Sequence, residues 1–191
     1  WNRTTDRSII VRNRSTNMKR RQFIRIIGGT CFTTAVAPRY GFGATATASS
    51  GVLVEASSFA ERGGWKLDTQ HYQQMGGCYL LAHGMGRPVA NAKTKVRLPE
   101  AGRWNVWVRT RDWCPGDWQA PGRFKLRVNG AELTAEFGTR EGWNWQAGGP
   151  VEIPAAGPVE VELVDLTGFD GRCDAIFFSR EASPKLPNQD L

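Results

Sequence analysis

Histidine is scarce in this chain, since only His71 and His83 occur among 191 residues. Two histidines leave little scope for a His-rich metal site or for a Ser-His-Asp triad. The sequence also lacks a phosphate-binding P-loop, a Gly-x-Ser-x-Gly elbow and a His-Glu-x-x-His motif. These absences argue against an enzyme. Because the paired carboxylates of glycoside hydrolysis have no diagnostic spacing, a small polysaccharide-active enzyme stays open as an alternative.

Cysteine is also rare, with four residues and no Cys-x-x-Cys pair or zinc-binding pattern. Cys31 falls in the N-terminal segment, which leaves Cys78, Cys114 and Cys173 in the rest of the chain. An odd number of thiols leaves at least one unpaired, so we expect one disulfide at most. A buried, unreactive thiol is the expected state of each cysteine.

Basic residues are concentrated at one end of the chain. The net charge is +7, but residues 1–46 hold nine basic residues and one acidic residue. The remaining residues, 47–191, hold 16 basic and 17 acidic residues, which is a net charge of −1. The larger part of the chain therefore has no global attraction for a phosphate backbone, and nucleic acid is not an expected partner.

The basic end has the pattern of a cleaved export signal. Arg20, Arg21 and Phe23 follow Met18 and resemble the twin-arginine export motif. We therefore predict a twin-arginine-type signal peptide over residues 18–48 and a periplasmic or secreted protein. An ordinary basic amphipathic N-terminus is the alternative.

The residues around this motif support the same interpretation. Residues 26–37 are mostly apolar or small, and residues 43–48 are small enough for a cleavage zone. The apolar run is too short to cross a bilayer as a helix, so no permanent membrane span is expected. Residues 1–17 precede the expected start, and we treat them as an unstructured upstream segment.

From Gly51 onward, apolar and polar residues alternate with a period of two between frequent turn residues. Such alternation is typical of half-buried strands. Asn129-Gly130 is the strongest hairpin signal and predicts that a strand at 123–128 pairs with one at 132–137. Eight further strands are expected: one from residue 52 to near residue 59, one in the first half of residues 102–122, and six at residues 65–70, 78–82, 89–98, 151–153, 159–166 and 173–179.

No helix of ten residues is indicated, so the predicted class is all-β. The number and length of the strands favour a two-sheet antiparallel jelly-roll sandwich over residues 49–181, followed by a linker at 182–191. Side chains alternate between the two faces of a strand, so Trp104 and Trp107 cannot both be buried on the same face. One is expected in the core, and the other under a loop or on the outer face of the sheet.

Four tryptophans lie in regions that look like loops, each beside a polar or charged residue. Aromatic faces pack on the C–H faces of sugars, and Asp, Asn, Gln and Arg side chains bind the hydroxyl groups. We therefore predict a carbohydrate site, with structural capping of the sandwich ends as the alternative. Its candidate residues are Arg111, Asp112, Trp113, Asp117, Trp118, Trp143 and Trp145.

Two further sets of charged residues are candidates for binding. Glu55 and Asp174 lie in the first and last strands, where two carboxylates with backbone carbonyls would suit a structural Ca²⁺; a Glu55–Arg172 salt bridge is the alternative. A second set alternates along two strands and could grip an acidic polysaccharide, although a solvated sheet face is the commoner outcome. This set consists of Arg109, Arg111, Arg123, Lys125 and Arg127.

Five segments resemble one or the other of two known families. Residues 54–59 and 171–176 are similar to galactose-binding-like β-sandwiches, a group that includes carbohydrate-binding modules and the xanthan-lyase-type binding domain. Residues 79–84, 107–113 and 165–174 are similar to the N-terminal region of exported bacterial FAD-dependent oxidoreductases. The resemblance implies an accessory module that binds carbohydrate or adjoins a catalytic domain. It implies no cofactor within this chain, and FAD only if a flavin domain follows.

Overall fold

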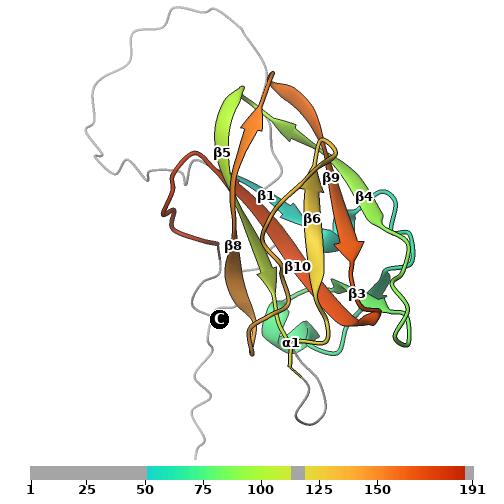
Figure 1. Cartoon of the computed structure of the whole chain (residues 1–191). Helices are drawn as coiled ribbons and strands as arrows, with labels where there is room; N and C mark the ends of the chain where they lie inside the picture. The colour runs from blue at the N-terminus through green and yellow to red at the C-terminus, as the bar shows by residue number, and fades with distance from the viewer. Residues whose placement is uncertain (1–50, 113–118, 188–191) are drawn as a thin grey trace, which may run out of the picture. The chain divides into compact units, whose positions relative to one another are not determined.

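The computed structural model describes residues 51–112 and 119–187. These residues form two antiparallel sheets packed face to face (Figure 1). The predicted signal segment lies outside the described residues, as do several candidate residues. Those candidates are Arg20, Arg21, Phe23, Trp113, Cys114, Asp117 and Trp118.

The larger sheet is organised around its longest strand, β10. Its order is β2-β3-β10-β5-β8, and β1 also pairs with β10. β5 lies along one edge of β10, while β3 and β1 share the other edge, one after the other along its length. The strands are β1 (Gly51–Glu55), β2 (Lys66–Asp68), β3 (Tyr79–His83), β5 (Gly102–Thr110), β8 (Asn144–Ile153) and β10 (Phe169–Ser179).

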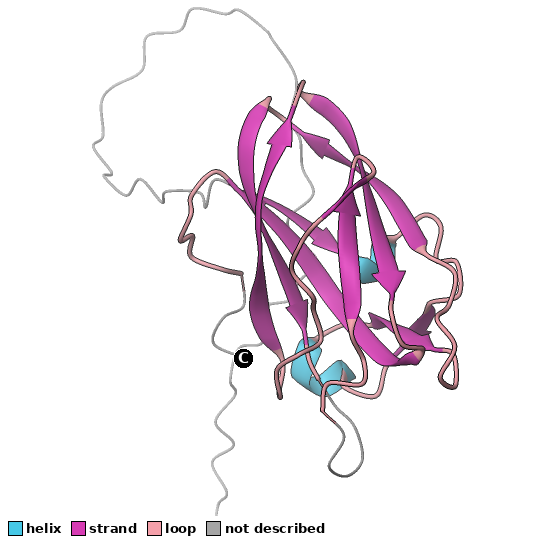
Figure 2. Ribbon diagram, viewed as in Figure 1, coloured by secondary structure: helices cyan, strands magenta, loops and turns pink. Residues whose placement is uncertain are grey.

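The smaller sheet has the order β4-β9-β6-β7. Its strands are β4 (Ala92–Leu98), β6 (Phe124–Val128), β7 (Ala131–Glu132) and β9 (Gly157–Asp165). Helical structure in the described residues is limited to the 3₁₀ turn η1 (Ala56–Ser58) and the one-turn helix α1 (Tyr72–Met75), as Figure 2 shows. The predicted all-β, two-sheet antiparallel sandwich is confirmed.

The inner faces of both sheets form one hydrophobic core. Trp65 packs edge-on against Phe124, with ring centroids 5.5 Å apart. Trp104 is buried in the core with Val106 and Val108, whereas Trp107 is only partly buried and pairs with Phe177 of β10. The predicted division of the two tryptophans between opposite faces of the strand is therefore confirmed.

The predicted hairpin is present, but its second strand is shorter than expected. Asn129 and Gly130 both have positive φ, as a two-residue type I′ turn requires, and they join β6 to β7. The continuous strand ends at Glu132, and residues 133–137 follow β6 only irregularly. The Leu133 N–H donates to the Leu126 carbonyl, and Phe137 forms an isolated antiparallel bridge with Phe124, so the expected pairing persists without a regular ladder. The Leu133 and Phe137 side chains are buried beside Gly148 of β8.

A second correction concerns β8, which begins at Asn144 and runs through residues 148–150, whereas we expected a strand only at 151–153. Gly149 has φ +88°, and the pairing with β5 shifts register between Val106 and Trp107. This irregularity is a β-bulge, which lets a strand bend without ending. Pro150 is tolerated because β8 is an edge strand.

The end of the described chain is attached to the sandwich. The indole of Trp145 donates a hydrogen bond from Nε1 to the Pro187 carbonyl at 3.0 Å, and Leu186 is buried. Residues 182–187, which we expected to be part of a linker, are thus tied to β8. In the part of the chain that the structure describes, no helix is long and apolar enough to cross a membrane.

Candidate functional site

The best candidate site is built around residues 69–78, which connect β2 to β3 and include α1. The connection starts with a hydrogen bond from Gln70 N–H to Asp68 Oδ1 at 2.9 Å. The helix ends at Gly76, whose left-handed φ of 70° lets its N–H reach the Tyr72 carbonyl. Met75 is fully buried and anchors the turn to the domain. A four-residue helix is too short to be stable alone, so this anchoring fixes it.

An aromatic cluster lies beside α1. We define it as His71, Tyr79 and Trp143, which come from the start of α1, the start of β3 and the bend before β8. The Tyr79 and Trp143 ring centroids are 5.0 Å apart, and His71 is 5.9 Å from Tyr79 and 5.8 Å from Trp143. Two of the three contacts are edge-to-face, which is the favoured geometry for aromatic pairs.

Polar groups hold the cluster in place. The buried Tyr79 donates its hydroxyl hydrogen to Asp68 Oδ2 at 2.7 Å. Burial, together with this bond to a carboxylate, raises the pKa of Tyr79 to about 12, so the hydroxyl stays protonated. Arg172 is buried nearby and donates from Nη1 to the Asp170 carbonyl at 2.9 Å. The Tyr79–Asp68 bond therefore links β3 to β2, and the Arg172–Asp170 bond holds the arginine within β10.

The surroundings of His71 favour its neutral form. Burial lowers the pKa of His71, and the positive charges of Arg111 and Arg172 lower it further, although Asp68 acts in the opposite direction. The Nη1 atom of Arg111 lies 3.4 Å from Nε2 of His71. A neutral imidazole can accept this hydrogen bond, whereas a protonated one would repel the guanidinium.

Asp112 closes the base of the neighbouring loop. Its N–H donates to the Arg140 carbonyl at 2.6 Å, and its Oδ2 accepts from the N–H of Ala120 at 3.1 Å. The carboxylate therefore pins the far end of the loop to its beginning. Burial raises the pKa of Asp112. Trp113, Asp117 and Trp118 belong to this loop but lie outside the described residues.

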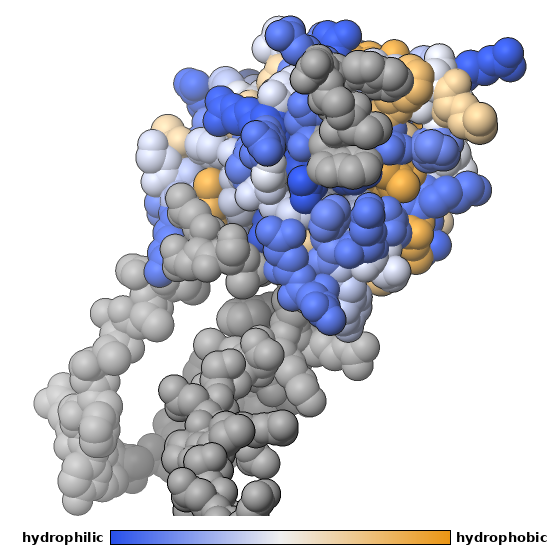
Figure 3. Space-filling view, turned by 90° about the horizontal axis from the view of Figure 1, so that it is seen from below, coloured by the Kyte–Doolittle hydropathy of each residue, from blue (hydrophilic) through white to orange (hydrophobic). Residues whose placement is uncertain are grey.

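A solvent-open hollow of about 620 Å³ adjoins α1. The hollow is not enclosed, so only part of this volume would contact a ligand. The surrounding end of the domain is seen in Figure 3, where most of the coloured surface is hydrophilic. The described residues that line the hollow are Thr69, Gln70, His71, Tyr72, Gln73 and Gln74.

The structure brings together some of the predicted site residues and separates another. Arg111 and Trp143 both contact His71, and Asp112 follows Arg111 directly. Trp145 instead lies within β8, where it faces Phe177 at 6.3 Å and holds Pro187. It is a strand residue rather than the loop residue that we expected.

Sequence reasoning missed His71, Tyr72 and Tyr79 as members of the site. The available signal was a polar stretch around Tyr72 that holds three glutamines and a histidine between two strands. This stretch shows neither the two-residue hydrophobic period of a strand nor the period of a helix.

The proposed calcium ligands lie close together but face a cation. Glu55 pairs with Ala175, beside Asp174, and Ala175 pairs with Arg109 on the other side of β10. Nη1 of Arg109 lies 3.6 Å from Oδ2 of Asp174, and both side chains are almost completely buried. The Arg109 guanidinium beside Asp174 would repel a Ca²⁺ ion bound there. The calcium site at Glu55 and Asp174 stays a prediction. Within residues 51–112 and 119–187, no group of three or more His, Cys, Asp or Glu side chains could hold a metal.

The predicted basic face is only partly correct. Arg109 is buried rather than directed to solvent, because it lies against Asp174 and Trp145 of neighbouring strands. The other members on the smaller sheet form ion pairs with glutamates: Arg123 with Glu136, Lys125 with Glu132, and Arg127 with Glu132 and Glu162. These pairs neutralise the charge that an acidic polysaccharide would need.

The cysteines that the structure describes are unpaired. Cys78 and Cys173 are free thiols, and burial raises the pKa of the Cys173 thiol well above its ordinary value. The latter is therefore a poor nucleophile, as expected of a core cysteine.

No protein-family model matches the sequence, and no curated protein matches it either. Solved structures do match its fold. A family 35 carbohydrate-binding module from Clostridium thermocellum has a TM-score of 0.53 and 17% identity, covering 68% of this chain and 97% of the module. The C-terminal family 6 carbohydrate-binding module of a marine laminarinase from Zobellia galactanivorans has a TM-score of 0.51 and 16% identity, covering 69% of this chain and all of the module.

A third match is a module within a larger enzyme. The β-1,4-mannanase of Podospora anserina, which carries a family 35 module, has a TM-score of 0.54 and 18% identity. The match covers 74% of this chain but only 29% of the mannanase. At these identities the likeness establishes the fold, a β-sandwich of the kind found in carbohydrate-binding modules.

Proposed function

We propose that the protein is a non-catalytic carbohydrate-binding module, exported by the twin-arginine route. Its ligand would bind at the hollow beside α1 and at the adjoining loop that carries Trp113, Asp117 and Trp118. The observation that carries this proposal is the hollow itself, which combines an exposed aromatic residue, Tyr72, with polar side chains over a rigid aromatic cluster. Flat aromatic faces and hydrogen-bonding groups together are what a sugar ring requires.

The comparisons support the proposal at the level of architecture. Two of the matched structures are isolated carbohydrate-binding modules, and the match covers almost their whole length. A single open site of this size is expected to bind with a Kd of about 1 μM to 1 mM, or roughly 4–8 kcal/mol.

Affinity electrophoresis against a panel of soluble polysaccharides tests the proposal. The full chain should be retarded by at least one polysaccharide, and Trp113→Ala or Trp118→Ala should reduce the retardation while the circular dichroism spectrum stays unchanged. The small-enzyme alternative predicts release of reducing sugars from the same polysaccharides. A panel with neither retardation nor release would rule out the proposal.

A second candidate is a structural domain that positions the flavin domain of an FAD-dependent oxidoreductase. It is favoured by the segment 165–174, whose resemblance to such proteins includes Asp170 and the buried Arg172, two residues that contact each other at the start of β10. Reading the nucleotide sequence beyond the Leu191 codon tests it. A strand followed by a Gly-x-Gly-x-x-Gly segment within about fifty codons would support the candidate, and a stop codon directly after Leu191 would count against it.

A further inference from the structure

We infer that Tyr72 is the stacking platform of this module and that its ligand is a neutral polysaccharide rather than an acidic one. The inference rests on the proposed function, because it names the ligand class and the contact residue of the same site. It differs from the sequence-based hypothesis, in which loop tryptophans were the platform.

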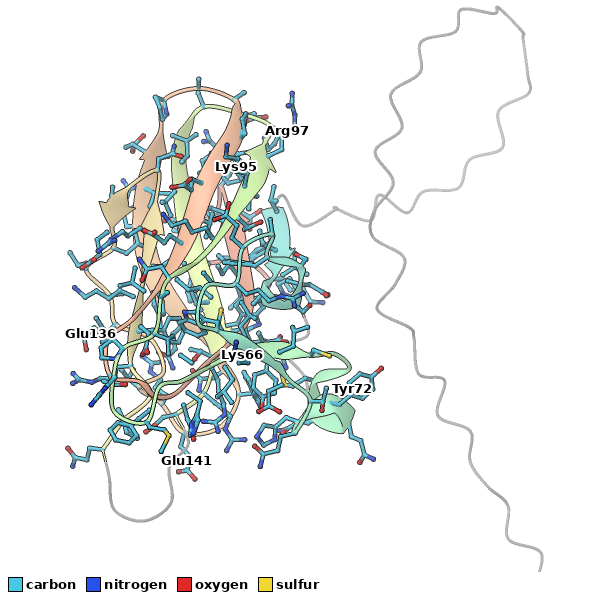
Figure 4. All side chains as sticks on the ribbon, turned by 90° about the vertical axis from the view of Figure 1, so that its right-hand side faces the viewer. Lys66, Tyr72, Lys95, Arg97, Glu136 and Glu141 are labelled. Carbon is cyan, nitrogen blue, oxygen red and sulfur yellow. The ribbon has the colours of Figure 1, made fainter. Side chains whose placement is uncertain are left out.

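Tyr72 is exposed although its surroundings are ordered. Its side chain is 54% exposed, and it lies at the edge of the described domain, directed away from the sheets (Figure 4). The N–H of Tyr72 donates to the Thr69 carbonyl at 2.8 Å, and its own carbonyl accepts from Gly76 at 2.7 Å. The backbone on both sides is thus fixed before any ligand arrives. A fixed aromatic side chain offers a large contact area at a small cost in conformational entropy.

The anchoring of α1 makes this exposure informative. Met75, three residues further on, is completely buried, and His71 on the other side packs in the aromatic cluster. Both neighbours orient the turn so that Tyr72 faces outward. The exposed ring contributes little to the fold, because it leaves apolar area in water. The ring is therefore accessible to a ligand.

The polar groups around Tyr72 indicate which sugars would fit. The described lining of the hollow offers the hydroxyl of Thr69 and the amides of Gln70, Gln73 and Gln74. Amides both donate and accept hydrogen bonds, as sugar hydroxyls do. None of these groups carries a charge, so a uronate carboxylate would lose water without gaining a partner, which costs binding energy.

Two charged groups close to this lining are already engaged. The Asp68 carboxylate accepts hydrogen bonds from the Tyr79 hydroxyl and the Gln70 N–H. The Arg111 guanidinium lies against His71. The described lining of the hollow therefore presents uncharged hydroxyl and amide groups beside the Tyr72 ring.

The test compares variants of the full chain on neutral and acidic polymers. The probes are galactomannan and xylan as neutral polysaccharides and polygalacturonate as the acidic one, with dissociation constants from affinity electrophoresis and calorimetry. We expect binding to a neutral polymer, a loss of about tenfold or more in Tyr72→Ala, and retention within about threefold in Tyr72→Phe, which keeps the ring. Phe169→Ala is the matched control, because Phe169 is also an exposed aromatic residue (38%) but lies outside the hollow lining.

The outcomes separate this inference from the proposed function. If Tyr72→Ala binds like the wild type while Trp113→Ala or Trp118→Ala does not, the module binds carbohydrate but Tyr72 is not its platform. Tighter binding to polygalacturonate than to either neutral polymer would overturn the ligand class. Failure of the wild type to bind any polysaccharide would remove the proposed function itself. Thermal midpoints of all variants show whether a loss of binding reflects unfolding.

Discussion

Replacement of Asp174 by alanine should destabilise the domain by about 3–5 kcal/mol. The Asp174 and Arg109 side chains are only 2% and 3% exposed, and their charged atoms lie 3.6 Å apart. Removing the carboxylate leaves the guanidinium buried beside apolar neighbours with less compensation. The cost comes mainly from that desolvated charge and not from the lost attraction.

The size of the effect follows from burial, and the chain offers an exposed ion pair as a control. Arg123 and Glu136 form an ion pair at 3.0 Å, but their side chains are 46% and 38% exposed. Breaking an exposed pair costs about 0–1 kcal/mol. Arg123→Ala should therefore change stability far less than Asp174→Ala, although its ion pair is shorter.

Urea denaturation followed by tryptophan fluorescence measures both variants. A loss of 3–5 kcal/mol should also lower the thermal midpoint by roughly 10–20 °C for a domain of this size. The double variant Arg109→Met, Asp174→Leu should recover most of the loss, because it removes both buried charges. Equal effects of Asp174→Ala and Arg123→Ala would refute the reasoning. So would a rise in the wild-type midpoint on adding calcium that Asp174→Asn abolishes, since Asp174 would then be a metal ligand.

Two other predictions concern pH and turn geometry. The pKa of His71 is lowered in the folded state, where the residue lies among Arg111, Arg172, Asp68 and Tyr79. As the pH falls below about 6.5, the histidine therefore takes up a proton in the unfolded chain before it does so in the folded one. Stability should therefore decrease as the pH falls below that value, and His71→Gln should flatten the dependence in urea titrations; an unchanged slope would contradict this assignment. Gly130→Ala should lower the free energy of unfolding by about 1–2 kcal/mol, because the φ of +79° strains the backbone of a residue with a side chain. No neighbouring atom lies within 4 Å of an added Cβ, so a steric clash adds nothing to this cost. An effect near zero in thermal denaturation would show that the turn relaxes.

The sandwich was predictable because its signals are local. The alternation around Trp104 fixes which face of β5 enters the core, and Asn129-Gly130 specifies a two-residue turn through its backbone preferences alone. The errors occurred where distant residues decide. Leu133 and Phe137 keep backbone bonds to β6, but residues 133–137 form no regular ladder. The contact of these two side chains with Gly148 of β8 is not revealed by any pattern within that segment.

The candidate site was less accessible from sequence for the same reason. Arg111, Asp112 and Trp143 were named from the sequence, but His71 is the residue that links Arg111 to Trp143. His71 belongs to the β2–β3 connection, and β10 separates β3 from β5 in the sheet. The helix α1 has four residues, too few to show a helical period. Residue type also misled: an arginine is normally exposed, yet Arg109 is buried because Asp174, supplied by another strand, balances its charge.

The central place of β10 has a kinetic consequence. This strand is the last of the described elements to be synthesised, yet β1, β3 and β5 all pair with it, and Gly51 is the partner of Ser179. A nascent chain that ends before β10 can form the smaller sheet and the β2–β3 and β5–β8 pairs of the larger sheet. It cannot join those two pairs or add β1, because β10 supplies these contacts. Pairings this distant in sequence form slowly because a long loop must close first. The larger sheet is therefore completed only after Ser179 has been synthesised, and until then β1 and one edge each of β3 and β5 have no strand partner.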